Sequence, residues 1–188
     1  MDLLGLIALA AGVSWASGLR IYLVVLLLGI VEHFHWLAMP RGASLFADPW
    51  VLVVAALLAS FEFVVDKVRR FDSKWENMRA LGRGLGGGVL AAWVVSGESD
   101  PMLTATAAVV GVFLATGTHA VKAMLRASLR QSHAPSVNVL VSSVEEALVL
   151  GAFALVLFQP TLFLIALGLF VISSPIAVFR LYLQAEEG

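Results

Sequence analysis

The charged residues of this chain are gathered between long apolar runs, and this distribution restricts the fold more than any other feature. Only 13% of the 188 residues are Asp, Glu, Lys or Arg, whereas 60% are hydrophobic, and the mean hydropathy is +0.94. A soluble domain of this length is normally less apolar and spreads its charges over amphipathic faces. We therefore expect an all-α membrane protein whose main partner is the lipid bilayer.

The apolar runs have the length of membrane-spanning helices, since a crossing needs roughly 20 residues at a rise of about 1.5 Å each. The sequence predicts six spans, two of them marginal: Leu3–Val31, Trp50–Val65, Gly84–Val95, Met102–Val121, Val137–Leu157 and Leu162–Phe179. The first run exceeds the length of a cleaved signal peptide and lacks a basic segment before it, so we interpret it as a retained helix.

The basic residues indicate the orientation, because loops rich in Lys and Arg stay in the cytoplasm. They follow the second, fourth and sixth runs: Lys67, Arg69, Arg70, Lys74, Arg79, Arg83, Lys122, Arg126, Arg130 and Arg180. Six spans with a cytoplasmic N-terminus place all of them on one side, whereas five or seven spans divide them between both. We therefore predict a multi-pass protein of the bacterial inner membrane with both termini in the cytoplasm.

The two halves of the chain share a short motif. Residues 12–20 align without a gap with residues 111–119, in the pattern G-V-x-x-A-[ST]-G-x-[RH]. The two segments belong to spans one and four, which run in opposite directions in a six-span protein. The sequence therefore predicts an inverted repeat of three plus three helices in one membrane domain, with halves 1–100 and 101–188. Such repeats recur in secondary transporters, whose binding sites lie between the halves.

Two basic residues interrupt the predicted spans at matching places in this repeat. Arg20 follows Gly18, and His119 follows Gly117. A helix break here would leave free amides that favour an anion, so spans one and four are candidates for interrupted helices. The alternative is a long tilted helix whose arginine is paired with a structural carboxylate. His119 is a candidate proton carrier or, equally, a hydrogen-bonded helix contact.

Acidic residues interrupt spans two and five. Glu62 and Asp66 are four residues apart on one helical face, and such a pair binds a cation, exchanges protons or forms an ion-paired helix end. Glu145 and Glu146 point in directions about 100° apart, so only one of them faces a given partner fully. Asn138 makes the start of span five polar. Because charge inside the bilayer costs at least a few kcal/mol, we take these residues as candidates for binding a substrate or ion.

A glycine-rich segment opens span three: Gly84, Gly86, Gly87 and Gly88. Small residues let helix backbones approach closely, so the segment predicts packing within the bundle or between the protomers of a homodimer. A phosphate-binding loop is excluded, because no strand precedes the glycines and no Lys-Ser or Lys-Thr follows them.

Other functional classes find little support. The chain has no cysteine, and His33 with His35 lacks a third ligand, so we expect no metal site and no cofactor. The glutamate pair is similar to that of CAAX-type intramembrane proteases, but Leu150 stands where their motif has arginine. No catalytic triad is apparent, and we expect no enzymatic activity. Nucleic-acid binding is also not expected, because no basic stripe lies on a polar surface.

The chain resembles a family of bacterial integral-membrane proteins, domain of unknown function 4126. The resemblance covers most of the chain and rests on these segments: Gly18-Leu19-Arg20, Glu62-Phe63-Val64-Val65-Asp66-Lys67 with Asp72, His119-Ala120-Val121-Lys122-Ala123, and Asn138 with the acidic pair. In that family the pair is usually Glu-Asp, which leaves the role of Glu146 open. The resemblance implies a membrane protein and no particular activity.

The leading hypothesis is a small transporter or channel-like permease for an unidentified ion or solute, with a charged cavity between the two halves. The alternative is a membrane scaffold or lipid-interacting protein that transports nothing and whose buried charges form structural ion pairs.

Overall fold

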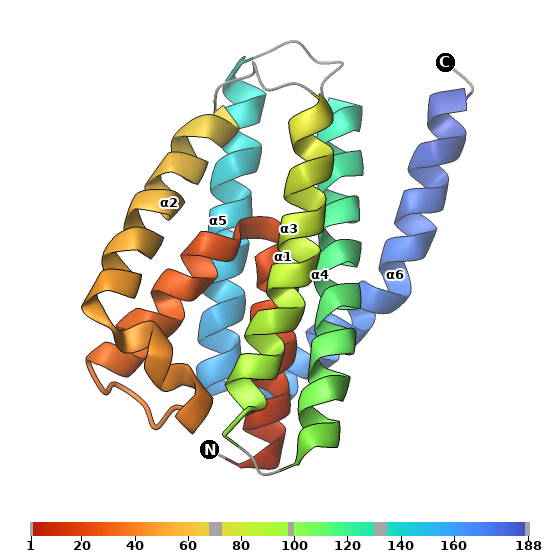
Figure 1. Cartoon of the computed structure of the whole chain (residues 1–188). Helices are drawn as coiled ribbons and strands as arrows, with labels where there is room; N and C mark the ends of the chain where they lie inside the picture. The colour runs from red at the N-terminus through yellow and green to blue at the C-terminus, as the bar shows by residue number, and fades with distance from the viewer. Residues whose placement is uncertain (1, 68–72, 98–99, 130–134, 187–188) are drawn as a thin grey trace.

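The computed structural model describes residues 2–67, 73–97, 100–129 and 135–186. In this part of the chain it contains six α-helices and one 3-10 helix (Figure 1): α1 (Leu3–His33), η1 (Arg41–Ala47), α2 (Pro49–Lys67), α3 (Ser73–Val95), α4 (Pro101–Leu129), α5 (Pro135–Phe158) and α6 (Pro160–Glu186). The predicted all-α class is confirmed for these residues.

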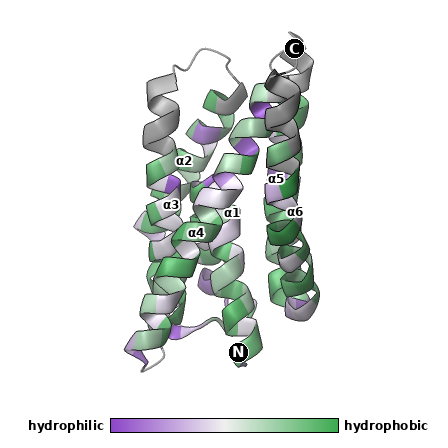
Figure 2. Cartoon of the chain, turned by 90° about the vertical axis from the view of Figure 1, so that its right-hand side faces the viewer, coloured by the Kyte–Doolittle hydropathy of each residue, from purple (hydrophilic) through white to green (hydrophobic). Residues whose placement is uncertain are grey.

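Three helices are long and apolar enough to cross a membrane: Leu3–His33, Pro101–Ala127 and Val139–Phe158. Three further apolar stretches are shorter: Pro49–Val65, Ala80–Val95 and Pro160–Ile176. Large apolar side chains are exposed along the outside of the bundle, and Figure 2 shows α5 and α6 as mostly hydrophobic over their described length. A surface of this kind is solvated by lipid rather than by water, so the chain is a membrane protein.

Helix α1 is broken at Arg20. The backbone there is extended, with φ −149° and ψ 82°, while the residues on both sides are helical. The first half rises from the N-terminus to the middle of the bundle, and the second half turns back toward the end from which the chain started (Figure 1). α1 therefore has enough residues for a crossing, but the break divides it into two shorter segments that run in different directions. The predicted interruption of span one is confirmed.

The first half of α1 runs parallel to α4. Ser14 lies against Gly111, Gly18 lies against Ala115, and the Lys122 ammonium donates to the Leu19 carbonyl oxygen. Residue numbers rise together along both helices, as they do only in parallel neighbours. The prediction that the two motif segments run in opposite directions is wrong, because the chain changes direction at Arg20 before it reaches α2.

The same reversal places the ends of the chain apart. The N-terminus lies at one end of the bundle, with η1 and the connection between α3 and α4, whereas α6 ends at the other (Figures 1 and 2). The two ends of the chain thus lie at opposite ends of the bundle, whereas two termini in the cytoplasm would lie at the same end. The predicted interruption of span four is also wrong, since α4 is one continuous helix from Pro101 to Leu129. Gly117 lies in open space on its surface, where nothing packs against it or bends it.

Close packing around the first half of α1 holds the bundle together. The most apolar stretch of α1 is 56% buried, against 28% in α4 and in α5, so α1 is the central helix. The glycines of α3 allow this approach: Gly86 contacts Ile21, Gly87 contacts Ala115, and Gly88 contacts Val112. Gly84 likewise lies against Thr116. All four glycines therefore pack within the bundle.

Candidate functional site

The break in α1 leaves a backbone carbonyl inside the protein, and a lysine side chain donates a hydrogen bond to it. Where a helix ends, its last carbonyl groups lose their partners along the chain. The Lys122 ammonium donates to the Leu19 carbonyl at 3.0 Å, and Lys122 itself is only 7% exposed. A cation at this position also opposes the negative end of the helix dipole. Lys122 therefore caps the C-terminal end of the first half of α1 and links it to α4.

Buried ion pairs join α4 to α5 beside the break. The Arg126 guanidinium donates to both oxygens of Glu145, at 2.8 Å each, in the paired geometry that gives strong hydrogen bonds. The Lys122 ammonium lies 3.0 Å from Glu145 Oε2, and Arg20 Nη2 lies 3.8 Å from the same oxygen. Arg20 and Arg126 also donate to the Ser142 hydroxyl. Glu145 is thus enclosed by cations, as a buried carboxylate requires.

A second chain of polar contacts joins α2, α3 and α4. The Arg83 guanidinium donates to Glu62 Oε1, and its other nitrogen lies 3.2 Å from His119 Nδ1. Because guanidinium nitrogens only donate, His119 Nδ1 accepts this bond and carries no proton. All three side chains are buried. In this arrangement the His119 ring is neutral and orients Arg83 toward Glu62.

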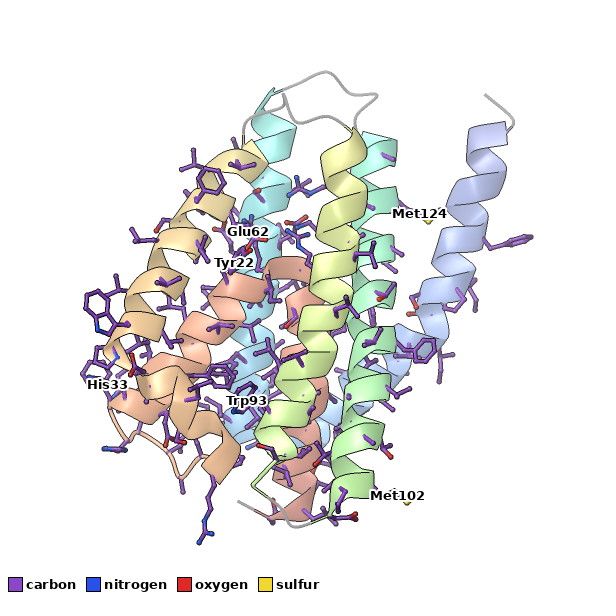
Figure 3. The ribbon with its side chains drawn as sticks, in the orientation of Figure 1. Tyr22, His33, Glu62, Trp93, Met102 and Met124 are labelled. Atoms are coloured by element: carbon purple, nitrogen blue, oxygen red, sulfur yellow. The ribbon has the colours of Figure 1, made fainter. Side chains whose placement is uncertain are left out.

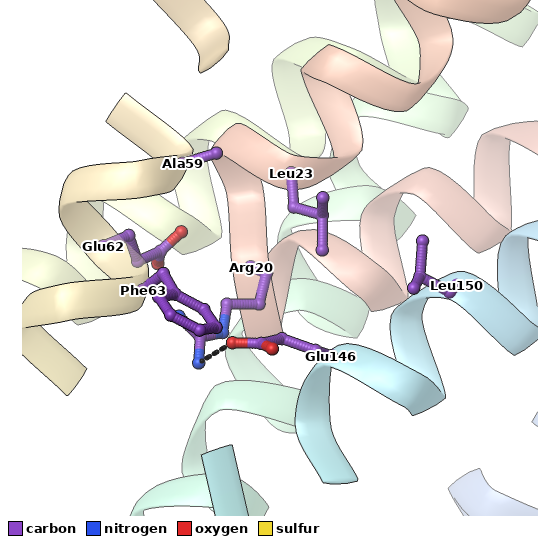
Figure 4. A pocket seen from close by; sticks show the side chains of 7 residues that line it. All are labelled: Arg20, Leu23, Ala59, Glu62, Phe63, Glu146 and Leu150. Carbon is purple, nitrogen blue, oxygen red and sulfur yellow. Dashed lines mark ion pairs between the residues drawn. The ribbon is translucent and has the colours of Figure 1, made fainter. Parts of the chain in front are cut away.

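The two groups of ion pairs meet at a cavity of about 180 Å³ between α1, α2 and α5 (Figure 4). Three charged and four apolar side chains line it: Arg20, Glu62, Glu146, Leu23, Ala59, Phe63 and Leu150. Glu62 points from α2 into the bundle, whereas Met102 and Met124 lie on the outer side of α4 (Figure 3). Because Arg20 lines the cavity, the cavity lies at the level of the break in α1.

The carboxylates of this cavity have unused hydrogen-bonding capacity. Among the described residues, Glu62 Oε2 and Glu146 Oε1 are buried oxygens that accept no hydrogen bond. Glu146 Oε1 lies 3.2 Å from Arg20 Nη2 and forms an ion pair without hydrogen-bond geometry. A buried oxygen without a donor costs about 1–3 kcal/mol, so these two atoms are the natural place for a ligand that donates. In the described part of the chain, no group of three or more His, Asp and Glu side chains could hold a metal ion.

The structure brings together five of the candidate residues proposed from the sequence: Arg20, Glu62, His119, Glu145 and Glu146. It also separates the two glutamates of the acidic pair. Glu146 lines the cavity, whereas Glu145 pairs with Lys122 and Arg126. Asp66 and Asn138 lie on α2 and α5, and their side chains are outside the described part of the structure.

Three cations of the site lie in helices and not in the loops that the sequence predicts for them. Arg83 lies ten residues inside α3, and Lys122 and Arg126 are within α4. A signal was present for two of them, because His119, Lys122 and Arg126 follow at spacings of three and four and so share one face of a helix. For Arg83 the neighbouring glycines gave no such periodic signal.

The sequence profile of one protein family, described as a domain of unknown function (DUF4126), matches residues 7–180. The chain belongs to this family. The match covers all the residues of the site, from Arg20 in α1 to Glu146 in α5. No curated protein and no solved structure matches the chain. Membership in DUF4126 thus agrees with the resemblance seen in the sequence and leaves the function to be argued from the site itself.

Proposed function

We propose that this DUF4126 protein is a small transporter or permease of the bacterial inner membrane that moves an ion or small solute through the cavity at the break in α1. The observation that carries the proposal is the pair of buried carboxylate oxygens, on Glu62 and Glu146, that accept no hydrogen bond among the described residues and line one cavity. Ionisable groups inside a membrane bundle are costly, and a binding site on a transport path is the usual reason to keep them.

The break in α1 supports this role. Transporter sites are commonly built where a helix is interrupted at mid-membrane, because the freed backbone and half-helix dipoles then face the cavity. Here Arg20 forms both the break and part of the cavity wall. Arg20 Nη2 also has two carboxylate partners, at 3.2 Å on Glu146 and 3.8 Å on Glu145. A cation that arrives at Glu146 competes with Arg20, and Glu145 is close enough to take the displaced guanidinium.

The proposed topology has five crossing helices, α2 to α6, and a re-entrant α1. The basic connections after α2 and α4 then share one side with the end of α6, which the positive-inside rule assigns to the cytoplasm. The N-terminus lies on the opposite side. α2 runs opposite to α5, and α3 runs opposite to α6 (Figure 1), so an inverted repeat is retained in the proposal with the second half of α1 as the counterpart of α4.

The test is ion flux into proteoliposomes that contain the purified protein. We expect gradients of protons, Na⁺ or methylammonium to drive a flux that falls at least about tenfold in Glu62→Gln and Glu146→Gln, since each removes a charged ligand group. Glu32→Gln is the matched control, because Glu32 lies near the end of α1 far from the cavity. Flux of all three ions at the level of empty vesicles would contradict the proposal.

One observation favours a second function, that of a membrane scaffold. Glu145 pairs with Lys122 and Arg126, as a structural ion-pair centre would. For a scaffold, neutralising Glu62 or Glu146 lowers thermal stability in proportion to the ion pair lost, and no ion or solute stabilises the folded protein. Stabilisation by a bound ligand, which follows mass action, separates the two functions.

A further inference from the structure

The Glu62 carboxylate is the feature that most restricts what the cavity can hold. Glu62 is 8% exposed, its Oε1 accepts from Arg83, and its buried Oε2 has no hydrogen-bond partner among the described residues. A carboxylate oxygen only accepts, so the ligand that completes it must supply an N–H or O–H group or a positive charge. A ligand that offers only hydrogen-bond acceptors is therefore excluded from Glu62 Oε2.

The rest of the wall is apolar. Leu23, Ala59 and Leu150 face the same space as the carboxylates, and Phe63 completes the lining (Figure 4). Phe63 is 42% exposed and Leu150 is 49% exposed, so the cavity reaches the outer surface between α2 and α5. A ligand can thus place a charged group on Glu62 and an apolar part toward the lipid.

A bare metal ion matches this wall less well than a larger cation does. Hard cations take about six or more oxygen ligands, and the described cavity offers only the Glu62 and Glu146 carboxylates beside the Arg20 guanidinium. The volume of about 180 Å³ is also larger than a single ion needs, since one water takes about 30 Å³. A positively charged group carried on several carbon atoms fills the space and matches both kinds of wall.

We propose that the cavity binds a primary ammonium group carried on a short apolar chain. The ammonium donates to Glu62 Oε2 and Glu146, and the chain packs against Leu23 and Leu150 and leaves between α2 and α5. Two sources supply this chemistry: a free alkylamine and the headgroup of an ethanolamine lipid. Glu62 is five residues from the end of α2, about 7–8 Å along the axis, which lies within reach of a headgroup. The inference rests on the proposed function, since it names the ligand of the same cavity.

The experiment measures binding to the detergent-purified protein by isothermal titration calorimetry and by thermal shift. The probe is n-butylammonium, which has three N–H donors and a four-carbon chain. n-Butanol tests the apolar contribution, and tetramethylammonium tests charge without N–H donors. We expect n-butylammonium to bind and raise the melting temperature, and the other two to bind at least about tenfold more weakly. Equal binding of either control compound overturns the proposal.

Two kinds of variant locate the bound ammonium. Glu62→Gln and Glu146→Gln should weaken n-butylammonium binding at least about tenfold. Ala59→Phe should block it by filling the cavity without removing a charge, so it stays informative if Glu62→Gln fails to fold. Leu57→Phe is the matched control, because Leu57 is two-thirds exposed on the outer side of α2 and does not line the cavity. Undiminished binding in folded Ala59→Phe overturns the proposal.

A competition arm separates the two sources of the ammonium. Phosphatidylethanolamine added to the micelles should displace n-butylammonium if the ligand is a lipid headgroup, and should leave it bound if the ligand is a free amine. Equal displacement by phosphatidylcholine, whose ammonium has no N–H, overturns the proposal. These measurements involve no flux. Binding without flux therefore refutes the transporter and keeps the ammonium site, and flux without binding does the reverse.

Discussion

Two neighbouring regions of the bundle are built on opposite principles, and α1 contributes to both. Around the first half of α1, small residues bring the backbones together, and the Ser14 hydroxyl donates to the Gly87 carbonyl at 3.1 Å. Six residues beyond Ser14, at Arg20, long charged side chains line a cavity between α1, α2 and α5. Close packing holds the first half of α1 in place, and the charged region leaves space for a ligand. The charged side chains around the cavity therefore lie where the close packing of the helix backbones ends.

The largest effect is expected where charges are fully enclosed. Glu145→Gln leaves Lys122 and Arg126 without their buried carboxylate, and loss of one partner from such a cluster costs about 3–5 kcal/mol. We expect a large fall in the melting temperature of the purified protein. Glu146→Gln should cost less, because Glu146 is more exposed and pairs with Arg20 at the cavity. Equal losses in the two variants would remove the distinction between enclosed charges and cavity charges.

An intermediate effect is expected in the packed region. A Cβ at Gly18 would overlap the Ala115 carbonyl oxygen, so Gly18→Ala should cost about 1–3 kcal/mol by overpacking. Gly117→Ala is the matched control, because Gly117 has open space around it and alanine favours the helix by about 0.5–1 kcal/mol. Thermal unfolding of both variants measures the difference. A Gly18→Ala protein as stable as Gly117→Ala would show that α1 is not held by close approach to α4.

The smallest effect is expected from the hydrogen bond between α1 and α3. Ser14→Ala removes the bond to Gly87, and a single hydrogen bond between helices in a membrane is worth about 0.6 kcal/mol on average. The single hydroxyl proton of Ser14 is shared between the Gly87 carbonyl and the Ala10 carbonyl of its own helix, which lies at 2.8 Å, so the loss should be small. A loss as large as that of Glu145→Gln would make polar bonds, rather than backbone approach, the main link in this region.

Much of this arrangement follows from the sequence. The cost of charge in lipid predicts that Arg20, Glu62 and the acidic pair lie inside the bundle, and Gly18 beside Arg20 predicts a break. The direction of the chain after the break does not follow, because hydropathy measures the length of an apolar run and not its path. The lengths of the apolar runs predict six spans and the basic residues support that number, yet a re-entrant α1 places the same basic residues on one side with five crossings. The sequence places Arg83, Lys122 and Arg126 in loops, because it does not show that carboxylates far away in the chain pair with them inside the protein.

The reversal of α1 at Arg20 is most directly tested by single-cysteine accessibility in oriented vesicles. The chain has no cysteine, so each introduced thiol is the only one. Four exposed positions are suitable: Leu3→Cys, Ser44→Cys, Ser96→Cys and Ala127→Cys. A membrane-impermeant maleimide should label positions 3, 44 and 96 from one side and position 127 from the other. Labelling of position 3 together with 127, opposite to 44, would mean that α1 crosses the membrane and would contradict the account.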